Sequence, residues 1–126
     1  MLRTVYGMDA CMMTNMIESE LLGLGITPDY RGYRYLCMAI EKAMQNEEYL
    51  YCITTKLYAD IARTMGTTPV NVERSIRTVI TVLWNDANTK QLYQLMGRNY
   101  ETPPGNAKFI GVMSRRLHFK YGAVEL

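Results

Sequence analysis

A break made of Gly66, two threonines and Pro69 separates two stretches of sequence that have helical spacing. The first stretch repeats an apolar residue at every fourth position: Leu57, Ile61 and Met65. This spacing predicts a helix over residues 57–65 that packs one face and exposes the other. Gly66 suits the positive φ at which many helices end, and Pro69 suits the first position of the next helix. The chain is therefore expected to turn sharply between two helices, with the hydroxyl of Thr67 or Thr68 capping the second.

The second stretch predicts a longer helix over residues 69–86 with one buried and one exposed side. Its apolar positions keep helical spacing: Val72, Ile76, Val79 and Leu83. The polar and charged side chains fall outside that stripe: Asn71, Glu73, Arg74, Arg77 and Thr78. Two helices joined by a tight turn, with charged side chains near the start of the second, form the layout of a helix-turn-helix DNA reader. Residues 57–86 are accordingly predicted to be a helix-turn-helix.

The exposed side chains of the second helix are of the types that read bases. The guanidinium group of Arg74 or Arg77 can bond guanine O6 and N7 together, and the carboxylate of Glu73 can accept a hydrogen bond from cytosine N4. A plainer interpretation is also open. Glu73 and Arg77 are four residues apart, so they can form an ion pair on an ordinary solvated helix, worth roughly 0.3–0.5 kcal/mol.

The charge of the chain is small but unevenly distributed. The 126 residues fit one domain with a core of its own, and the net charge is only +2. Residues 1–49 contain four basic and seven acidic residues, whereas residues 50–126 contain ten basic and five acidic ones. The basic half contains the predicted helix-turn-helix, as expected of a surface that contacts phosphate.

No set of residues for catalysis or for metal binding is visible. Three cysteines without CxxC spacing, Cys11, Cys37 and Cys52, support neither a disulfide framework nor a zinc site. Cys37 and Cys52 are expected to be small buried side chains. His118 is the only histidine, which leaves no Ser/His/Asp set and no histidine cluster. The chain is therefore predicted to be neither an enzyme nor a cofactor binder, and to lie in the reducing cytoplasm, with no signal peptide or membrane-spanning segment.

The chain as a whole predicts an all-α fold, a compact bundle of about six helices with no convincing strand. The helices are expected over residues 16–24, 33–46, 57–65, 69–86, 89–96 and 107–119. Thr14 or Asn15 is expected to cap the first helix, and Gly25 to end it. Trp84 is expected to hold the fourth helix against the core. Residues 1–12 are interpreted as a short leader, and residues 13–126 as a single domain.

The sequence between the second and third helices is the least clear part of the chain. Residues 49–53 are apolar and aromatic enough for a short strand. Because no second run of this kind is available to pair with them, they are predicted to form a buried connector. Thr54 or Thr55 is then expected to cap the third helix.

Several segments, in unbroken order over about residues 16–119, resemble one known family. They are Gly25-Ile-Thr-Pro, Arg31-Gly-Tyr-Arg-Tyr-Leu, Ile53-Thr-Thr-Lys-Leu-Tyr-Ala-Asp-Ile-Ala, Val72-Glu-Arg-Ser-Ile-Arg, Trp84 and Asn106-Ala-Lys-Phe-Ile. They resemble the C-terminal effector domain of the sporulation master regulator, the stage 0 sporulation protein A family of endospore-forming Firmicutes. The resemblance implies an all-helical domain whose fourth helix enters the major groove of double-stranded DNA. It also implies that Glu73, Arg74 and Arg77 are the residues that contact bases.

Further contacts are implied by the resemblance or by charge. The DNA backbone could be bound by basic side chains: Lys56, Arg63, Lys108, Arg115 and Arg116. Asn71 and Thr78 stand where the family often has basic or histidine residues, so they are weaker candidates for the same role. Lys90 and Gln91 fall on the surface through which the family contacts the RNA polymerase sigma subunit. They are equally well explained as ordinary solvated helix residues.

The last helix of the family helps two effector domains meet on tandem DNA sites. This implies dimer contacts for Phe109, Met113 and Arg116, although Phe109 and Met113 also fit a core position. The family's receiver domain has no counterpart in this sequence, so the chain is either a free-standing member or one domain of a longer protein. The alternative to a DNA-binding regulator is an interaction module that modulates a full-length regulator or a sigma factor without a specific DNA site of its own.

Overall fold

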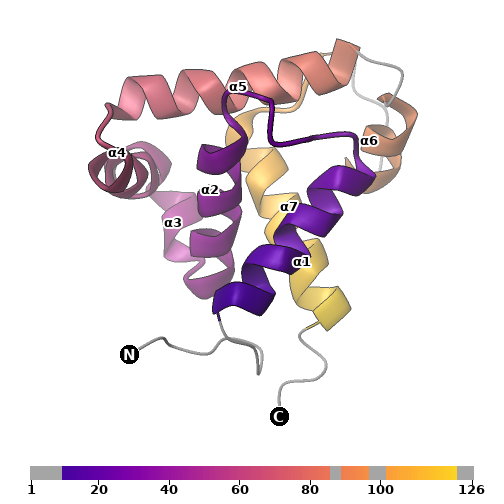
Figure 1. The fold of residues 1–126 in the computed structure, drawn as a ribbon, viewed down its shortest axis with the longest axis horizontal. Coiled ribbons are helices and arrows are strands. Elements are labelled where there is room, and N and C mark those ends of the chain that lie inside the picture. The colour runs from indigo at the N-terminus through magenta and orange to yellow at the C-terminus, as the bar shows by residue number, and fades with distance from the viewer. Residues whose placement is uncertain (1–9, 86–88, 97–101, 122–126) are drawn as a thin grey trace.

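The computed structural model describes residues 10–85, 89–96 and 102–121, and these residues form a bundle of helices without a strand. The elements in order are α1 (Ala10–Gly23), α2 (Tyr33–Gln45), α3 (Glu48–Tyr51), the π-helix η1 (Ile53–Tyr58), α4 (Ala59–Met65), α5 (Pro69–Asn85), α6 (Thr89–Met96) and α7 (Asn106–Tyr121). The predicted all-α bundle is confirmed. In Figure 1, α5 crosses the top of the molecule, and α1, α2 and α7 lie below it. None of the described helices is both long and apolar enough to cross a bilayer.

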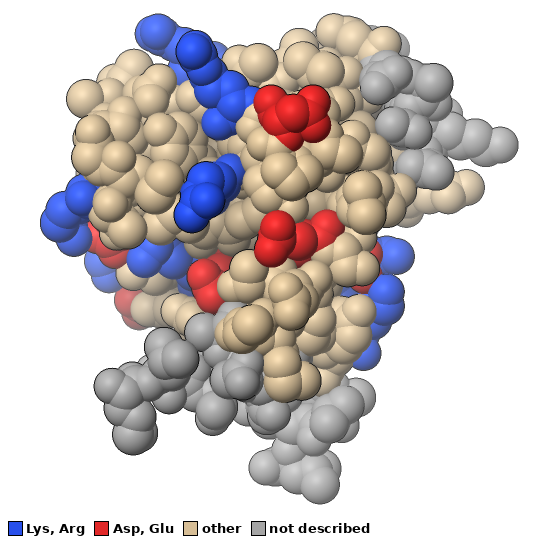
Figure 2. Space-filling model, viewed as in Figure 1, with Lys and Arg blue, Asp and Glu red and all other residues tan. Residues whose placement is uncertain are grey.

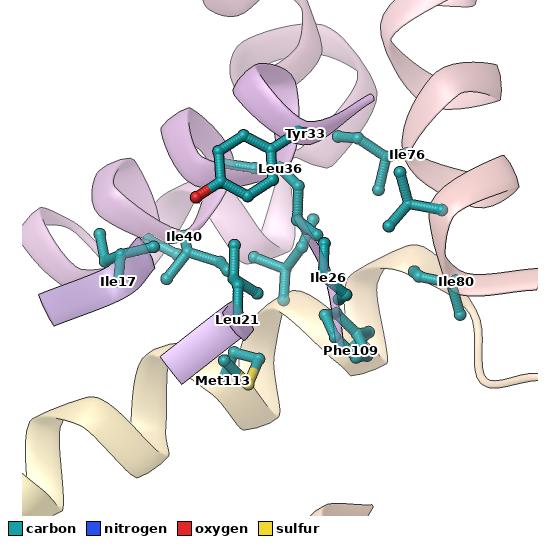
Figure 3. Close-up of a cluster of buried hydrophobic side chains, with 14 of the residues drawn as sticks. Ile17, Leu21, Ile26, Tyr33, Leu36, Ile40, Ile76, Ile80, Phe109 and Met113 are labelled. Atoms are coloured by element: carbon teal, nitrogen blue, oxygen red, sulfur yellow. The ribbon is translucent and has the colours of Figure 1, made fainter. Parts of the chain in front are cut away.

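The core lies where α2 meets α1, α5 and α7, and Figure 3 shows side chains from all four helices converging there. The central side chains are fully buried: Ile17, Leu21, Leu36, Ile40, Ile76, Ile80, Phe109 and Met113. The apolar stripe predicted for the helix over residues 69–86 is therefore part of the core, as are Phe109 and Met113 of the last helix. Trp84 is partly buried against this cluster, as expected of a residue that holds α5 to the core.

The first helix is longer than predicted. It begins at Ala10, six residues before the expected start at Met16, so Thr14 and Asn15 lie inside it and do not cap it. The reason is that Met13 extends the buried stripe of Ile17 and Leu21 by one turn and is itself buried.

Gly25 was predicted to end the first helix, and it forms the turn that follows the last residue of α1, Gly23. The φ of Gly25 is +90°, and the N–H of Ile26 donates to the carbonyl of Leu21 at 2.9 Å while the N–H of Gly25 donates to the carbonyl of Leu22 at 2.9 Å. These two bonds satisfy carbonyl groups that the end of a helix would leave unpaired. They also bury Ile26 in the core.

The predicted buried connector over residues 49–53 is wrong. The segment contains α3 and the start of η1, and just before α3 the side chain of Asn46 accepts the backbone N–H of Glu48 at 3.0 Å. Tyr51 is 83% exposed and Cys52 is exposed as well. Thr54 and Thr55 lie inside η1, so neither caps the following helix. The third predicted helix is split accordingly, with Leu57 and Tyr58 in η1 and the α-helix beginning at Ala59.

The cysteines differ from expectation in burial. Cys52 is exposed rather than buried, and Cys11 is exposed too. Cys37 is partly buried, and burial raises the pKa of its thiol to about 11, although a hydrogen bond with Tyr33 opposes the shift. The thiol of Cys37 therefore stays protonated at neutral pH and behaves as a small core-edge side chain.

Helices α2 and α5 approach one another closely at Gly32. A Cβ atom at this position would lie 2.3 Å from the carbonyl oxygen of Ser75 and 2.6 Å from its carbonyl carbon. Gly32 is the buried residue immediately before α2, and Ser75 is buried within α5. The absence of a side chain at Gly32 thus sets how closely the start of α2 lies against α5.

Glu20 connects α1 to the end of α7. Its carboxylate lies 2.6 Å from the Nζ of Lys120 and 3.5 Å from the Nε of Arg116. Burial raises the pKa of Glu20, but the hydrogen bond and charge of Lys120, with those of Arg116, outweigh it and hold the pKa below its ordinary value of 4.5.

Glu20→Gln is expected to lower the free energy of unfolding by about 0.5–1 kcal/mol at pH 7. The effect is small because the basic partners, Lys120 and Arg116, are exposed to solvent. A carboxyl group with a lowered pKa in the folded state stabilises above its unfolded value and loses that effect as the pH falls through the folded value. The difference between variant and parent should therefore be smaller at pH 3 than at pH 7 in urea unfolding. Glu47→Gln, which removes an exposed partner 4.0 Å from Arg115, is the control and should change little at either pH.

Candidate nucleic-acid interface

Helices α4 and α5 are joined by a tight turn at Gly66. The φ of Gly66 is +67° and its ψ is +40°, which is the left-handed conformation that glycine adopts without strain. The N–H of Thr67 donates back to the carbonyl of Ala62 at 2.9 Å. The predicted helix end at Gly66 is confirmed, and the chain can start a second helix within three residues.

Thr68 caps the second helix. Its Oγ1 accepts the backbone N–H of Asn71 at 3.1 Å, and Pro69 takes the first helical position as predicted. The side-chain amide of Asn71 donates to the Oγ1 of Thr67 at 2.8 Å and approaches the hydroxyl of Tyr35 on α2 at 3.5 Å. The start of α5 is thus held by the turn that precedes it and by α2.

The first half of α5 presents Arg74 to solvent. Arg74 is exposed, and it belongs to the side of the helix opposite to the buried Val72, Ser75 and Ile76. Within the described part of the chain, no ion pair or hydrogen bond engages its guanidinium group. Thr78 is exposed one turn further on, and its hydroxyl donates to the carbonyl of Arg74 at 2.9 Å. Arg74 therefore keeps all its side-chain donors for a ligand.

Glu73 and Arg77 form an ion pair along α5. The Nη2 of Arg77 lies 3.0 Å from the Oε1 of Glu73, and the side chain of Glu73 is 35% exposed. This is the i, i+4 pair that the spacing allowed. Both residues of the pair line a surface groove beside α5, together with Tyr58 and Ala107. Arg77 itself is exposed and lies on the same side of the helix as Arg74.

Asn106 fastens the start of α7 to α5 and η1. Its side-chain nitrogen donates to the carbonyl of Glu73 at 3.0 Å and to the hydroxyl of Tyr58 at 3.1 Å. Burial and the nearby charge of Glu73 raise the pKa of Tyr58, while the bond from Asn106 opposes that shift. One side chain thus links three elements at the point where α5 carries its charged residues.

Asn106→Ala is expected to lower the free energy of unfolding by about 1–3 kcal/mol. The substitution removes two partly buried hydrogen bonds and leaves the hydroxyl of Tyr58 and the carbonyl of Glu73 without that donor. Urea unfolding followed by circular dichroism measures the change. Asn15→Ala is the control, because the amide of Asn15 reaches only the sulfur of Cys11 at 4.0 Å on the exposed side of α1. Equal stability of the two variants would contradict the assigned role of Asn106.

Arg31 and Arg34 are two further exposed basic residues near α5, and the sequence analysis gave them no role. Both are exposed at the start of α2, next to Gly32 and therefore next to α5. In Figure 2, Lys and Arg side chains project from the upper left of the molecule, where Figure 1 shows the first half of α5. The signal in the sequence is the spacing Arg31-Gly-Tyr-Arg34, in which a close-packed glycine lies between two arginines.

Most of the basic side chains proposed to bind the DNA backbone are paired with carboxylates. The pairs are Lys56 with Glu48 at 3.5 Å, Arg63 with Asp60 at 3.1 Å, Arg115 with Glu47 at 4.0 Å and Arg116 with Glu20 at 3.5 Å. Lys108 is exposed in the first turn of α7. Lys56 and Arg63 lie on the elements that precede α5. Arg115 and Arg116 lie in the second half of α7, which runs away from α5 in Figure 1, so they are not brought together with Arg74.

The residues implied in contacts with other proteins fall into two groups. Lys90 and Gln91 are in α6, but their side chains lie outside the described residues. Phe109 and Met113 are fully buried in the core, whereas Arg116 is exposed. The core position that the sequence also allowed for Phe109 and Met113 is the one they occupy.

A comparison with families of known proteins matches this chain to one of them. The model of the family described as "Sporulation initiation factor Spo0A C terminal" matches residues 17–117. The match begins in α1 and ends in α7, and it includes the whole of α4, the turn and α5.

Proposed function

Because this chain belongs to the Spo0A C-terminal family of DNA-binding regulatory domains, we propose that it is a transcription regulator that reads a specific DNA sequence through α5. In this proposal α5 enters the major groove and α4 crosses the DNA backbone, as in other helix-turn-helix proteins. The observation that carries the proposal is the position of Arg74. It is exposed on a helix whose start is capped, and its donors are not engaged by other described side chains.

Each charged residue of α5 has a distinct role in this proposal. Arg74 reads a guanine through O6 and N7, because a free guanidinium group can make both bonds at once. Arg77 reads a second purine and Glu73 a cytosine. The 3.0 Å pair between Glu73 and Arg77 holds both side chains in place before DNA binds, and it must loosen if Arg77 is to bond a base.

Phosphate contacts then come from the residues around α5. Arg31 and Arg34 are exposed near Gly32, which lies against Ser75 of α5, and Arg63 lies on α4. Asn71 and Thr78 carry no charge, and their side-chain donors are engaged within the domain, so a contact of either with phosphate must replace an existing hydrogen bond and releases no counterion. Each charged contact contributes about one unit to the slope of log K against log salt, so a modest slope is expected.

The proposal is tested by fluorescence anisotropy with two duplexes, one carrying two tandem family-type boxes and one scrambled. The titrations are made at two salt concentrations. A preference for the boxes that survives the higher salt is the expected result, because base contacts depend less on salt than phosphate contacts do. Equal binding to both duplexes that disappears at higher salt would contradict base reading.

A second candidate function is favoured by one surface feature. A groove between α2, α3 and α7 is lined in part by Met44, Leu50, Val112 and Phe119. Apolar side chains on a surface groove are typical of protein contacts. An interaction module that acts on a full-length regulator or on sigma would use such a surface, and it would show no preferred duplex in the anisotropy experiment.

Two partners other than DNA are part of the proposal. One is the RNA polymerase sigma subunit, contacted near Lys90 and Gln91. The other is a second copy of the chain on tandem boxes, for which Arg116 is the exposed member of the implied contact residues. A cytoplasmic location follows from these partners.

A further inference from the structure

We propose that Val70 is a specificity residue that recognises the C5-methyl group of a thymine, an inference that rests on the proposed DNA-reading function. Val70 is the second residue of α5 and is 63% exposed. It is an apolar residue at the end of the helix where helix-turn-helix proteins contact base edges. Its side chain is not part of the core cluster, of the turn before α5 or of the described ion pairs.

The position of Val70 has no explanation in the stability of the domain. The side chain is excluded from the core cluster. A β-branched residue is a poorer helix former than alanine, so an exposed valine does not favour the helix either. The cap of α5 is made by Thr68 and Asn71, through atoms that do not involve Val70.

Val70 lies on the side of α5 that is proposed to face the DNA. Arg74 follows it by four residues and Arg77 by seven, so the three side chains share one row of the helix. The distance along the axis from Val70 to Arg74 is about 6 Å, and successive base pairs are about 3.4 Å apart. A helix lying in the groove would therefore place Val70 within about two base pairs of the base that Arg74 reads.

The chemistry of the major groove leaves one match for an isopropyl group. Adenine, guanine and cytosine present hydrogen-bonding atoms at this edge, whereas thymine adds an apolar methyl group. Contact between Val70 and that methyl removes two apolar groups from water. Loss of roughly one methyl group from such a contact weakens binding about fourfold.

The test removes the same methyl group from the DNA and from the protein. The preferred box is selected from random duplexes with the parent protein, and each thymine is then replaced singly by deoxyuridine, which keeps base pairing and lacks only the methyl. Dissociation constants are measured for the parent, Val70→Ala and Val82→Ala. Val82 is the matched control, because it is also exposed on α5, at 44%, but lies about 120° away around the helix.

We expect one thymine at which deoxyuridine weakens binding of the parent and of Val82→Ala by about three- to tenfold. That thymine should lie within two base pairs of the position at which Arg74→Ala relaxes specificity. Val70→Ala should bind the thymine and deoxyuridine duplexes equally. The midpoint of its thermal unfolding should be at least as high as that of the parent, because alanine is a better helix former at an exposed site.

Two results would overturn the inference and leave the proposed function standing. One is a preferred box to which Val70→Ala and the parent respond alike when each thymine is replaced. The other is a preferred box with no thymine near the base read by Arg74. A parent protein that prefers no duplex at all would overturn both this inference and the proposed function.

Discussion

Arg74→Ala is expected to weaken binding to the preferred box by roughly 5- to 150-fold, about 1–3 kcal/mol, while binding to scrambled DNA changes little. Arg74 is exposed on the outer side of α5, and other described side chains do not engage its guanidinium group. Removing it deletes a two-bond contact with one base and leaves the packing of the helix intact. Anisotropy titrations on the two duplexes measure the change, and circular dichroism checks that the fold is retained.

Arg63→Ala is the control for loss of charge alone. Arg63 is also an exposed arginine of the helix-turn-helix, but it lies on α4 and pairs with Asp60 at 3.1 Å. Its removal should weaken binding to both duplexes by similar factors, because a phosphate contact carries no sequence information. If Arg74→Ala also weakened both duplexes equally, Arg74 would be a backbone contact and the proposed base reading would be wrong.

Gly32→Ala is expected to lower the free energy of unfolding by about 3 kcal/mol, the upper part of the range for overpacked sites. The new Cβ would lie 2.3 Å from the carbonyl oxygen of Ser75. Since that atom belongs to the backbone of α5, no side-chain rotation can relieve the contact, and α2 must move away from α5. Urea unfolding measures the loss, and the anisotropy assay measures the accompanying loss of DNA binding.

Gly23→Ala is the matched control, because a Cβ at Gly23 meets no atom within 4 Å. It lies at the end of α1, where alanine is better than glycine, so a stability gain of up to about 1 kcal/mol is expected. If Gly32→Ala were as stable as Gly23→Ala, the close approach between α2 and α5 would not be a constraint on the fold.

The turn between α4 and α5 could be predicted from the sequence because its causes are local. Gly66 supplies a left-handed residue, Thr68 a cap and Pro69 a helix start, and each acts within a few residues of its own position. The core faces of α2, α5 and α7 could be predicted for a related reason. A helix buries the residues that recur with its own period, whichever partner it packs against.

Residues 48–58 could not be predicted in the same way. Their aromatic and β-branched side chains favour extended structure, but the segment is helical, and it buries Leu57 and Tyr58 in the bundle. The start of α1 was misplaced because Thr14 and Asn15 are good caps in isolation. Met13, however, continues the i, i+4 spacing of Ile17 and Leu21, and its burial extends the helix past both residues.

In the candidate site too, features with local causes could be predicted, and features that depend on packing could not. The exposed position of Arg74 and the pairing of Glu73 with Arg77 follow from helical spacing. The two hydrogen bonds from Asn106 reach Glu73 and Tyr58, which are 33 and 48 positions away in the chain. They therefore depend on how α7 packs. The same holds for the place of Arg31 and Arg34, since Gly32 between them packs against Ser75, 43 positions along the chain.

The carboxylate partners of the basic side chains have a consequence for how the protein would search a genome. Glu73 offsets the charge of Arg77 on α5, and acidic partners offset Lys56 and Arg63 on the elements before it. A surface with little uncompensated charge is held weakly by the large excess of unrelated DNA in a cell. Occupancy of a target depends on the ratio of specific to nonspecific affinity, weighed against the number of competing sites. Pairing the charges lowers the nonspecific term, so fewer copies of the protein would be sequestered between targets.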